Sequence, residues 1–241
     1  MSLGHGASIA RNGLVLHLDA ANSKSYIGTG TNWADLSGNA YNGTLVDGPI
    51  FSSSDRGSFA FDGLNDRVHL TSTSDRWSWT PSGNGLNFMT VEIVFKSNDT
   101  NSGYILSKPW NGSGEYNWTI TQSSFNTLIG NQSHSLTYTS LASTNWQHLC
   151  AIITPTQKSI YRNGVLYAGP TNHSTTNNTP TSGNASVELC LMSLYPYGSG
   201  WAGNTGFSIE GNLATVKIYN RALLATEVQQ NFEALRGRYG I

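Results

Sequence analysis

Short runs of alternating apolar and polar residues, separated by Gly, Asn, Ser and Pro, recur along this sequence from residue 13 to residue 219. Successive side chains of a β-strand point to opposite faces, so this alternation predicts strands and an all-β sandwich or barrel. The expected strands are residues 13–18, 57–61, 66–70, 88–96, 103–107, 116–121, 126–130, 146–153, 158–162, 164–168, 186–194 and 207–219.

Residues 88–96 show how the two faces of a strand separate. One face is wholly apolar and consists of Met89, Val91, Ile93 and Phe95. The other face is mostly polar and consists of Thr90, Glu92, Val94 and Lys96. We therefore expect one face of this strand in the core and a mostly polar face opposite it.

Two local signals are specific. Asn163 and Gly164 lie between two strand-like runs, and this pair favours the positive φ angles of a two-residue type I′ hairpin turn. Residues 225–236 are expected to form a helix, because the apolar residues Leu224, Val228, Phe232 and Leu235 recur at helical spacing and would form one apolar stripe. The usual capping Ser or Thr before Glu227 is replaced by Leu224, so we expect the cap to be missing or displaced.

Composition narrows the class of protein. The 241 residues show no linker-like shift in composition, so we expect one domain over residues 13–241. Only 11% of residues are charged, and the 13 Lys and Arg form no basic stripe, which argues against nucleic-acid binding. No run is long and apolar enough for a membrane span. Cys150 and Cys190 lie in apolar runs, so we expect buried free thiols rather than one bridge between strands.

Residues 1–12 are small and polar, without periodicity, and form an N-terminal arm. Two alternatives follow: a disordered tail, or an extended arm that docks on a neighbouring subunit. The first residues contain no basic region and no apolar stretch of signal-peptide length, so we expect synthesis in the cytoplasm without a signal peptide.

Catalytic patterns are missing from the sequence. Retaining glycoside hydrolysis needs two carboxylates about 5–5.5 Å apart, which on one strand means acids at i and i+2 or i+4. Glu92, Glu188 and Glu210 each stand alone on their strands, whereas Asp62 and Asp66 flank a turn. Nucleophile-elbow, zinc-protease and phosphate-loop motifs are also missing. We therefore expect no enzymatic activity and no required cofactor.

The order of several short segments resembles the laminin-G-like domains of the concanavalin A-like lectin/glucanase superfamily. These segments are residues 13–19 (GLVLHLD), 33–39 (WADLSGN) with 42–44 (NGT), 59–63 (FAFDG) with 66–68 (DRV), and 213–223 (LATVKIYNRAL). The resemblance implies a two-sheet antiparallel jelly-roll sandwich with a short C-terminal helix. It settles nothing about activity, because lectins, hydrolases and structural shells share this fold.

The opening residues 12–22 and the closing residues 230–240 look like those of tailed-bacteriophage proteins, especially from marine hosts. That resemblance implies a structural virion protein (a capsid decoration, tail or fibre component) made in the host cytoplasm. It would be a homo-oligomer, with a trimer favoured, that contacts other virion proteins and adheres weakly to host surface glycans. The alternative is a free carbohydrate-binding lectin module with a Ca²⁺-dependent loop site.

Two sets of side chains are candidates for a site. Aromatic residues in polar, Gly-rich stretches could contact glycans, anchor an interface or close over the core as lids; they are Trp77, Trp79, Trp110, Tyr195, Tyr197 and Trp201. A structural Ca²⁺, which many similar domains hold, would use oxygen ligands in turns; the candidate acids are Asp35, Asp62 and Asp66, with Asn39 and Asn65 beside them. Alternatively, Asp35 and Asp62 bond backbone amides of their own turns.

Overall fold

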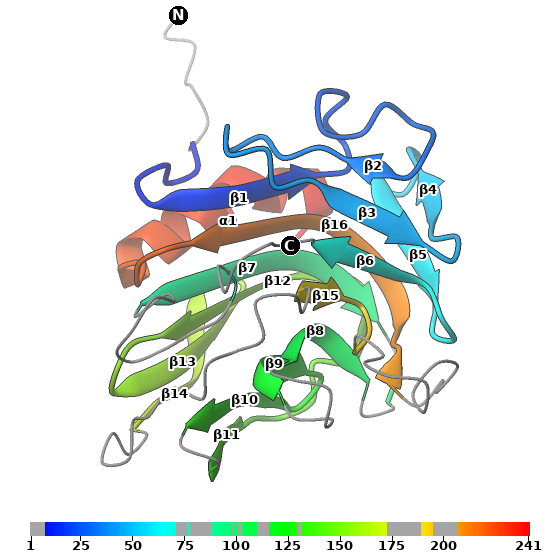
Figure 1. The fold of residues 1–241 in the computed structure, drawn as a ribbon. Coiled ribbons are helices and arrows are strands. Elements are labelled where there is room, and N and C mark those ends of the chain that lie inside the picture. The colour runs from blue at the N-terminus through cyan, green and yellow to red at the C-terminus, as the bar shows by residue number, and fades with distance from the viewer. Residues whose placement is uncertain are drawn as a thin grey trace, which may run out of the picture.

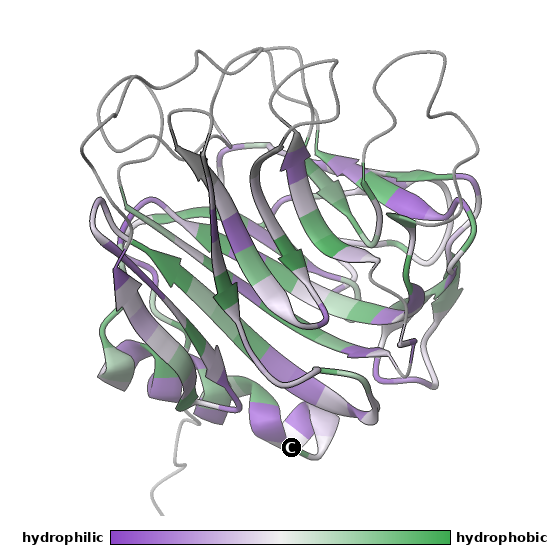
Figure 2. Ribbon diagram, turned by 90° about the horizontal axis from the view of Figure 1, so that it is seen from below, coloured by the Kyte–Doolittle hydropathy of each residue, from purple (hydrophilic) through white to green (hydrophobic). Residues whose placement is uncertain are grey.

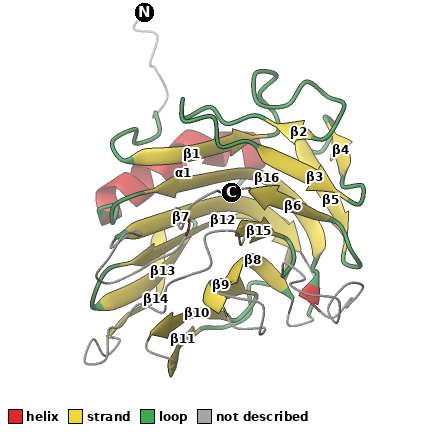
Figure 3. Ribbon diagram, viewed as in Figure 1, coloured by secondary structure: helices red, strands yellow, loops and turns green. Residues whose placement is uncertain are grey.

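A computed structural model describes residues 8–70, 77, 88–97, 99–100, 103–109, 116–129, 132–172, 189–194 and 207–241. Two antiparallel β-sheets stack face to face, and a short C-terminal helix lies against the outer face of the larger, strongly curved sheet (Figures 1 and 3). This is the two-sheet sandwich with a C-terminal helix that the sequence predicts. Among the described residues, no helix is long and apolar enough to cross a membrane.

The sheet that carries the helix, here sheet A, has the strand order β14-β13-β12-β7-β16-β5-β4. Strand β16 pairs with two different strands along one side: its first residues pair with β5 and its last residues pair with β1. The strands of sheet A are β1 (Leu14–Asp19), β4 (Ile50–Ser52), β5 (Ser58–Asp62), β7 (Met89–Ser97), β12 (Ser143–Ile153), β13 (Gln157–Arg162), β14 (Val165–Asn172) and β16 (Glu210–Tyr219).

The facing sheet, here sheet B, has the order β11-β10-β9-β8-β15-β6-β3-β2. Its strands are β2 (Asn32–Trp33), β3 (Gly43–Val46), β6 (Arg67–Leu70), β8 (Tyr104–Pro109), β9 (Tyr116–Thr121), β10 (Ser124–Ile129), β11 (Gln132–Thr137) and β15 (Leu189–Leu191).

Each strand range expected from the alternation overlaps a strand of the structure. The hairpin turn is also confirmed, because Asn163 and Gly164 have φ angles of 50° and 78°. Strands β2, β3, β4 and β11 were not predicted. The first three have two to four residues, too few for a visible alternation, and β11 has Leu136 as its single apolar residue.

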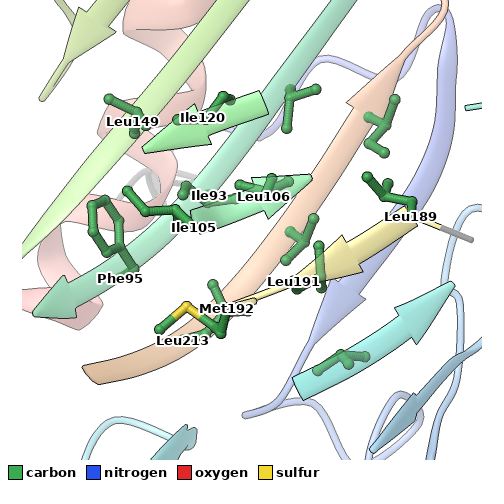
Figure 4. Packing of buried hydrophobic residues seen from close by; sticks show 14 of the residues in the cluster. Ile93, Phe95, Ile105, Leu106, Ile120, Leu149, Leu189, Leu191, Met192 and Leu213 are labelled. Atoms are coloured by element: carbon green, nitrogen blue, oxygen red, sulfur yellow. The ribbon is translucent and has the colours of Figure 1, made fainter. Parts of the chain in front are cut away.

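The core lies between the two sheets. Ile93, Phe95, Leu149 and Leu213 of sheet A meet a second set of side chains from sheet B and the residue that follows β15: Ile105, Leu106, Ile120, Leu189, Leu191 and Met192 (Figure 4). Along most strands these apolar residues alternate with polar ones, visible as green and purple bands in Figure 2. Each fully buried side chain of this kind contributes about 1.5–3 kcal/mol. Cys150 and Cys190 are both buried free thiols, as predicted.

Helix α1 (Ala225–Tyr239) covers the face of β7 that points away from the core. Val94, Trp146 and Ala214 pack there against Leu235 and Tyr239. The predicted polar face of β7 is therefore buried as well, which the alternation along one strand cannot reveal. The helix continues three residues past the predicted end, and Gly240 closes it in the left-handed conformation (φ 70°).

The start of α1 differs from the predicted stripe. Leu224 is 67% exposed and serves as the N-cap, so it does not join the apolar face. The Leu224 N–H donates to Glu227 Oε2 at 2.9 Å. This is one of the two hydrogen bonds of a capping box; the other one needs a Ser or Thr side chain at the N-cap. Two hydrogen bonds from Arg221 hold the Glu227 carboxylate and lower its pKa.

A charged cluster is buried beneath α1. Glu92 Oε1 lies 2.8 Å from His148 Nε2, and Glu92 Oε2 accepts a hydrogen bond from Asn231 Nδ2 at 2.7 Å and lies 3.8 Å from Lys217 Nζ. Glu92, His148 and Lys217 are each at most 1% exposed. Burial opposes ionisation of Glu92, yet Lys217, His148 and Asn231 outweigh it and keep the pKa of its carboxyl below its usual value. The cluster thus joins three strands and the helix.

Residues 8–12 dock on the same chain. Ala10 N donates to Asn231 Oδ1 at 2.7 Å, and Tyr219 OH donates to Ala10 O at 3.0 Å. Asn231 therefore bonds both the N-terminal segment and Glu92. These residues of the predicted arm are therefore held on their own chain; its remainder, residues 1–7, lies outside the described residues.

We predict that Glu92→Gln lowers the free energy of unfolding by about 3–5 kcal/mol, because it leaves the Lys217 ammonium buried without a counter-charge. The double variant Glu92→Met, Lys217→Met removes both charges and should recover a large part of that loss. Denaturant unfolding of the wild type, Glu92→Gln, Glu92→Met, Lys217→Met and the double variant measures the differences. A double variant as unstable as the sum of its two single variants would contradict this account.

Lys158 is a second buried cation, placed between the sheets. Its Nζ donates to His134 O and to Thr127 Oγ1, and burial lowers its pKa to about 7. In the unfolded chain the pKa returns to about 10.4, so between these two values the unfolded state binds the extra proton. Stability from this group therefore increases as the pH rises from about 7 towards 10.

We predict that the free energy of unfolding of the wild type rises from pH 7 to pH 9.5 relative to that of Lys158→Met. The difference amounts to at most a factor of about ten in the unfolding equilibrium constant per pH unit. Urea titrations at half-unit steps of pH measure it, with Lys24→Met as an exposed control. Parallel profiles of wild type and Lys158→Met would refute the prediction.

Candidate functional site

An open pocket of about 270 Å³ lies at the end of sheet A where β16 begins. Ala60, Asn212 and Lys96 stand side by side on β5, β16 and β7 and form its floor, on the face away from the core, because their sequence neighbours Phe95 and Leu213 point into it. The residues that line the pocket are Ala60, Phe61, Lys96, Ser97, Ser143, Thr144, Glu210, Gly211 and Asn212.

The sheet opens here because two of its strands lose regular pairing. The register of β12 against β7 shifts between Ser143 and Gln147, and the register of β16 against β7 shifts between Leu213 and Thr215. Bulges of this kind bend a strand and redirect its side chains, and they are frequent beside binding sites. Thr144 is thereby carried to the wall of the pocket.

Glycine is required at one point of the floor. A Cβ atom at Gly211 would lie 2.5 Å from the carbonyl oxygen of Lys96, closer than any side chain can approach. Next to it, the hydroxyl of Ser97 donates to Glu210 O and accepts a hydrogen bond from Gln122 Nε2 at 3.1 Å. The backbone of the floor is therefore held tightly, which makes the pocket a preformed one.

Lys96 is held from two sides. Its Nζ lies 2.9–3.0 Å from the carboxylate oxygens of Asp55 and 4.9 Å from the ring centroid of Trp146. The Trp146 ring packs in turn on Tyr239 at 5.3 Å, so the last turn of α1 supports the ammonium group. This arrangement fixes a donor at the pocket while its charge is neutralised by Asp55.

The remaining polar groups of the pocket are open to a ligand. Within the described part of the chain, the side chains of Thr144 and Asn212 have no hydrogen-bond partner. A hydroxyl and an amide each offer donors and acceptors, and the Glu210 carboxylate adds acceptors. Such a mixed set suits a molecule that carries many hydroxyl groups on a compact frame.

Asp35 and Asp62 bond their own turns. Asp35 Oδ1 accepts from His17 N and Ser37 N, and Oδ2 accepts from Tyr41 N. Asp62 Oδ1 accepts from the three N–H groups that follow Gly63, at 2.8 to 3.4 Å. Partial burial opposes ionisation of Asp62, but these amides outweigh it and lower its pKa. Both acids thus bond amides of their own turns, the alternative that the sequence left open, and Asp35 in addition bonds β1 through His17.

Asp66 belongs to the same turn, since its Oδ2 accepts from Asp62 N at 3.1 Å, and burial raises its pKa. Among the described residues no three His, Cys, Asp or Glu side chains come together as a metal site. Calcium binding stays a prediction of the sequence.

Trp77 is fully buried and acts as a lid over the core. Its ring stacks edge to face on Tyr41 at 5.5 Å, and its carbonyl oxygen accepts a hydrogen bond from Trp118 Nε1. It is therefore not a surface contact for a glycan or a partner. The other aromatic candidates, Trp79, Trp110, Tyr195, Tyr197 and Trp201, lie outside the described residues.

The pocket residues were not among the sequence candidates. Ser143, Thr144 and Asn212 are ordinary polar residues of strands, and the sequence does not show which strands are neighbours. One signal was present, since Gly211 interrupts an expected strand, and such a glycine often marks a bulge or a close backbone approach.

Comparison with known families places the fold. Residues 80–229, more than half of the chain, match the laminin-G-type model described as concanavalin A-like lectin/glucanases superfamily. The chain belongs to this superfamily. The family resemblance and the antiparallel sandwich predicted from the sequence are both confirmed. A search of curated protein sequences found no match to the chain.

Solved structures with the same fold match the chain at low identity. A Trypanosoma rangeli sialidase is 13% identical, with a TM-score of 0.68, over 99% of this chain and 35% of its own. The binding domain of Paraclostridial Mosquitocidal Protein 1 is 15% identical, with a TM-score of 0.62, over 92% of this chain and 52% of its own. This chain thus spans about a third of the sialidase's length.

Domain 4 of AbnA, an extracellular arabinanase from Geobacillus stearothermophilus, matches nearly end to end. It is 14% identical, with a TM-score of 0.55, over 90% of this chain and 97% of its own, and its structure was solved in complex with arabinotriose. At these identities the three likenesses concern the fold alone. Nevertheless, one of these structures, the AbnA domain of nearly the same length, contains a bound oligosaccharide.

Proposed function

We propose that this chain is a carbohydrate-binding module and that the pocket on sheet A holds one sugar unit of its glycan. The observation that carries the proposal is the preformed pocket with the unpartnered Thr144 and Asn212 side chains beside the fixed Lys96 ammonium. Its volume of about 270 Å³ is just below the usual range of small-molecule sites, which suits a single sugar ring. The arabinotriose complex of a domain with this fold supports the same class of ligand.

We further propose that the module binds without hydrolysing its glycan. A glycosidase needs one carboxyl group with a raised pKa as general acid beside a second carboxylate. Asp62 is the cross-strand partner of Glu210 next to the pocket, but three backbone amides lower its pKa and occupy one of its oxygens. Glu92 is buried under α1 and out of reach of a substrate.

We predict that Asn212→Ala weakens glycan binding about 2- to 10-fold, because one hydrogen bond of about 0.5–1.5 kcal/mol is lost. Thr144→Trp should abolish binding, since the indole fills the pocket. Isothermal titration with oligosaccharides that a glycan array has selected measures both, and a reducing-end assay on the same mixtures checks for hydrolysis.

Thr156→Trp is the matched control for the pocket variant. Thr156 is exposed in the turn after β12, at the opposite end of that strand from Thr144, so the same substitution there should leave glycan binding unchanged. A glycan-binding wild type whose affinity survives Thr144→Trp would place the sugar elsewhere. A wild type that retains no glycan would refute the proposed function.

We also propose that copies of the module are displayed on a tailed-phage particle, where many weak sites act together. The support is the resemblance of residues 12–22 and 230–240, and these two segments are adjacent in the fold because Arg238 Nη1 donates to both carboxylate oxygens of Asp19. Mass spectrometry of purified particles should then detect the chain in many copies. Recovery only as a free monomer would refute the particle role and leave glycan binding standing.

A further inference from the structure

The two charged side chains of the pocket differ in one respect. The Lys96 ammonium is paired with Asp55 at 2.9–3.0 Å, so its charge is already balanced. The Glu210 side chain is exposed, and within the described residues it forms no ion pair. The pocket therefore presents one carboxylate whose charge is not matched by a neighbouring cation.

The surroundings of Glu210 strengthen its negative field. Its cross-strand partner is Asp62, which the amides of its own turn keep ionised. Among the described residues around the pocket, Asp55 and Lys96 cancel each other, whereas Glu210 and Asp62 leave its mouth net negative, so an acidic sugar would be repelled.

We infer that Glu210 is a specificity-determining residue that selects glycans with a free amino group, such as 2-amino-2-deoxy sugars, over neutral and acidic ones. The inference rests on the proposed carbohydrate-binding function. The hydroxyls and amide of the pocket hold the ring, and the protonated amine of the sugar lies against the Glu210 carboxylate. Acetylation of that amine removes its charge and with it the advantage.

The size of the effect follows from the exposure of Glu210. An ion pair at a surface is worth about 0.2–1 kcal/mol, so the amine should improve affinity by about 1.5- to 5-fold per site. Because exposed charges are screened, the advantage should shrink as the salt concentration rises from 0.05 M to 0.5 M.

The experiment compares three tetrasaccharides of the same linkage: glucosamine, N-acetylglucosamine and glucose oligomers. Titration calorimetry of the wild-type protein at pH 6, where the amines are protonated, should give the tightest binding for the glucosamine oligomer. Glu210→Gln should remove this preference, so that the ratio of the affinities for the glucosamine and glucose oligomers falls to about one. Glu233→Gln is the matched control, because it removes the same charge from the exposed face of α1.

Asp55→Asn provides a second and opposite perturbation. It leaves Lys96 without its counter-charge and should reduce the preference for the amine without touching Glu210.

Equal affinities for all three oligomers, or a preference that survives Glu210→Gln, would overturn the inference while leaving the carbohydrate-binding function intact. Loss of the preference in the presence of EDTA would overturn it as well, since a metal ion would then be the charged partner. Absence of binding to any oligomer, on the array as in the calorimeter, would reject the proposed function itself.

Discussion

The ionised carboxylate of Glu92 under helix α1 is the constraint on which the outer layer of this protein depends. A buried charge is tolerated only when it is paired and hydrogen-bonded, and its partners here come from β12, β16 and α1. Asn231 extends the network to the N-terminal segment through Ala10. An apolar helix could sit on the sheet in several registers, but this one must place Asn231 over Glu92.

The pocket depends on the same helix in a less direct way. The end of α1 packs Tyr239 on Trp146, and Trp146 holds the Lys96 ammonium at the pocket. The bulges in β12 and β16 open the sheet next to this support. A rigid layer on one side and a local break in strand pairing on the other together yield a preformed site without a long loop.

Much of the fold could be predicted from the sequence, because alternation of side chains is a local property. Met89, Val91, Ile93 and Phe95 face the core as their spacing indicates, and Asn163 and Gly164 form the expected turn. Strand pairing and helix packing are not local. That Glu92 meets Lys217, or that Asn212 lies beside Lys96, depends on which strands are neighbours, and no spacing within one strand records it. For this reason the sequence did not predict the buried cluster or the pocket. The acids of the turns could be picked out because the residues of each turn lie close together in the sequence.

Strand β16 has a consequence for how the molecule could be mounted on a support. Its first residue lines the pocket, and its last residue bonds the N-terminal segment at Ala10. Ten residues of strand separate these points by about 30 Å. An attachment made through the N-terminal segment would therefore direct the pocket outward, away from the support, and the stiff strand would act as the spacer between anchor and ligand.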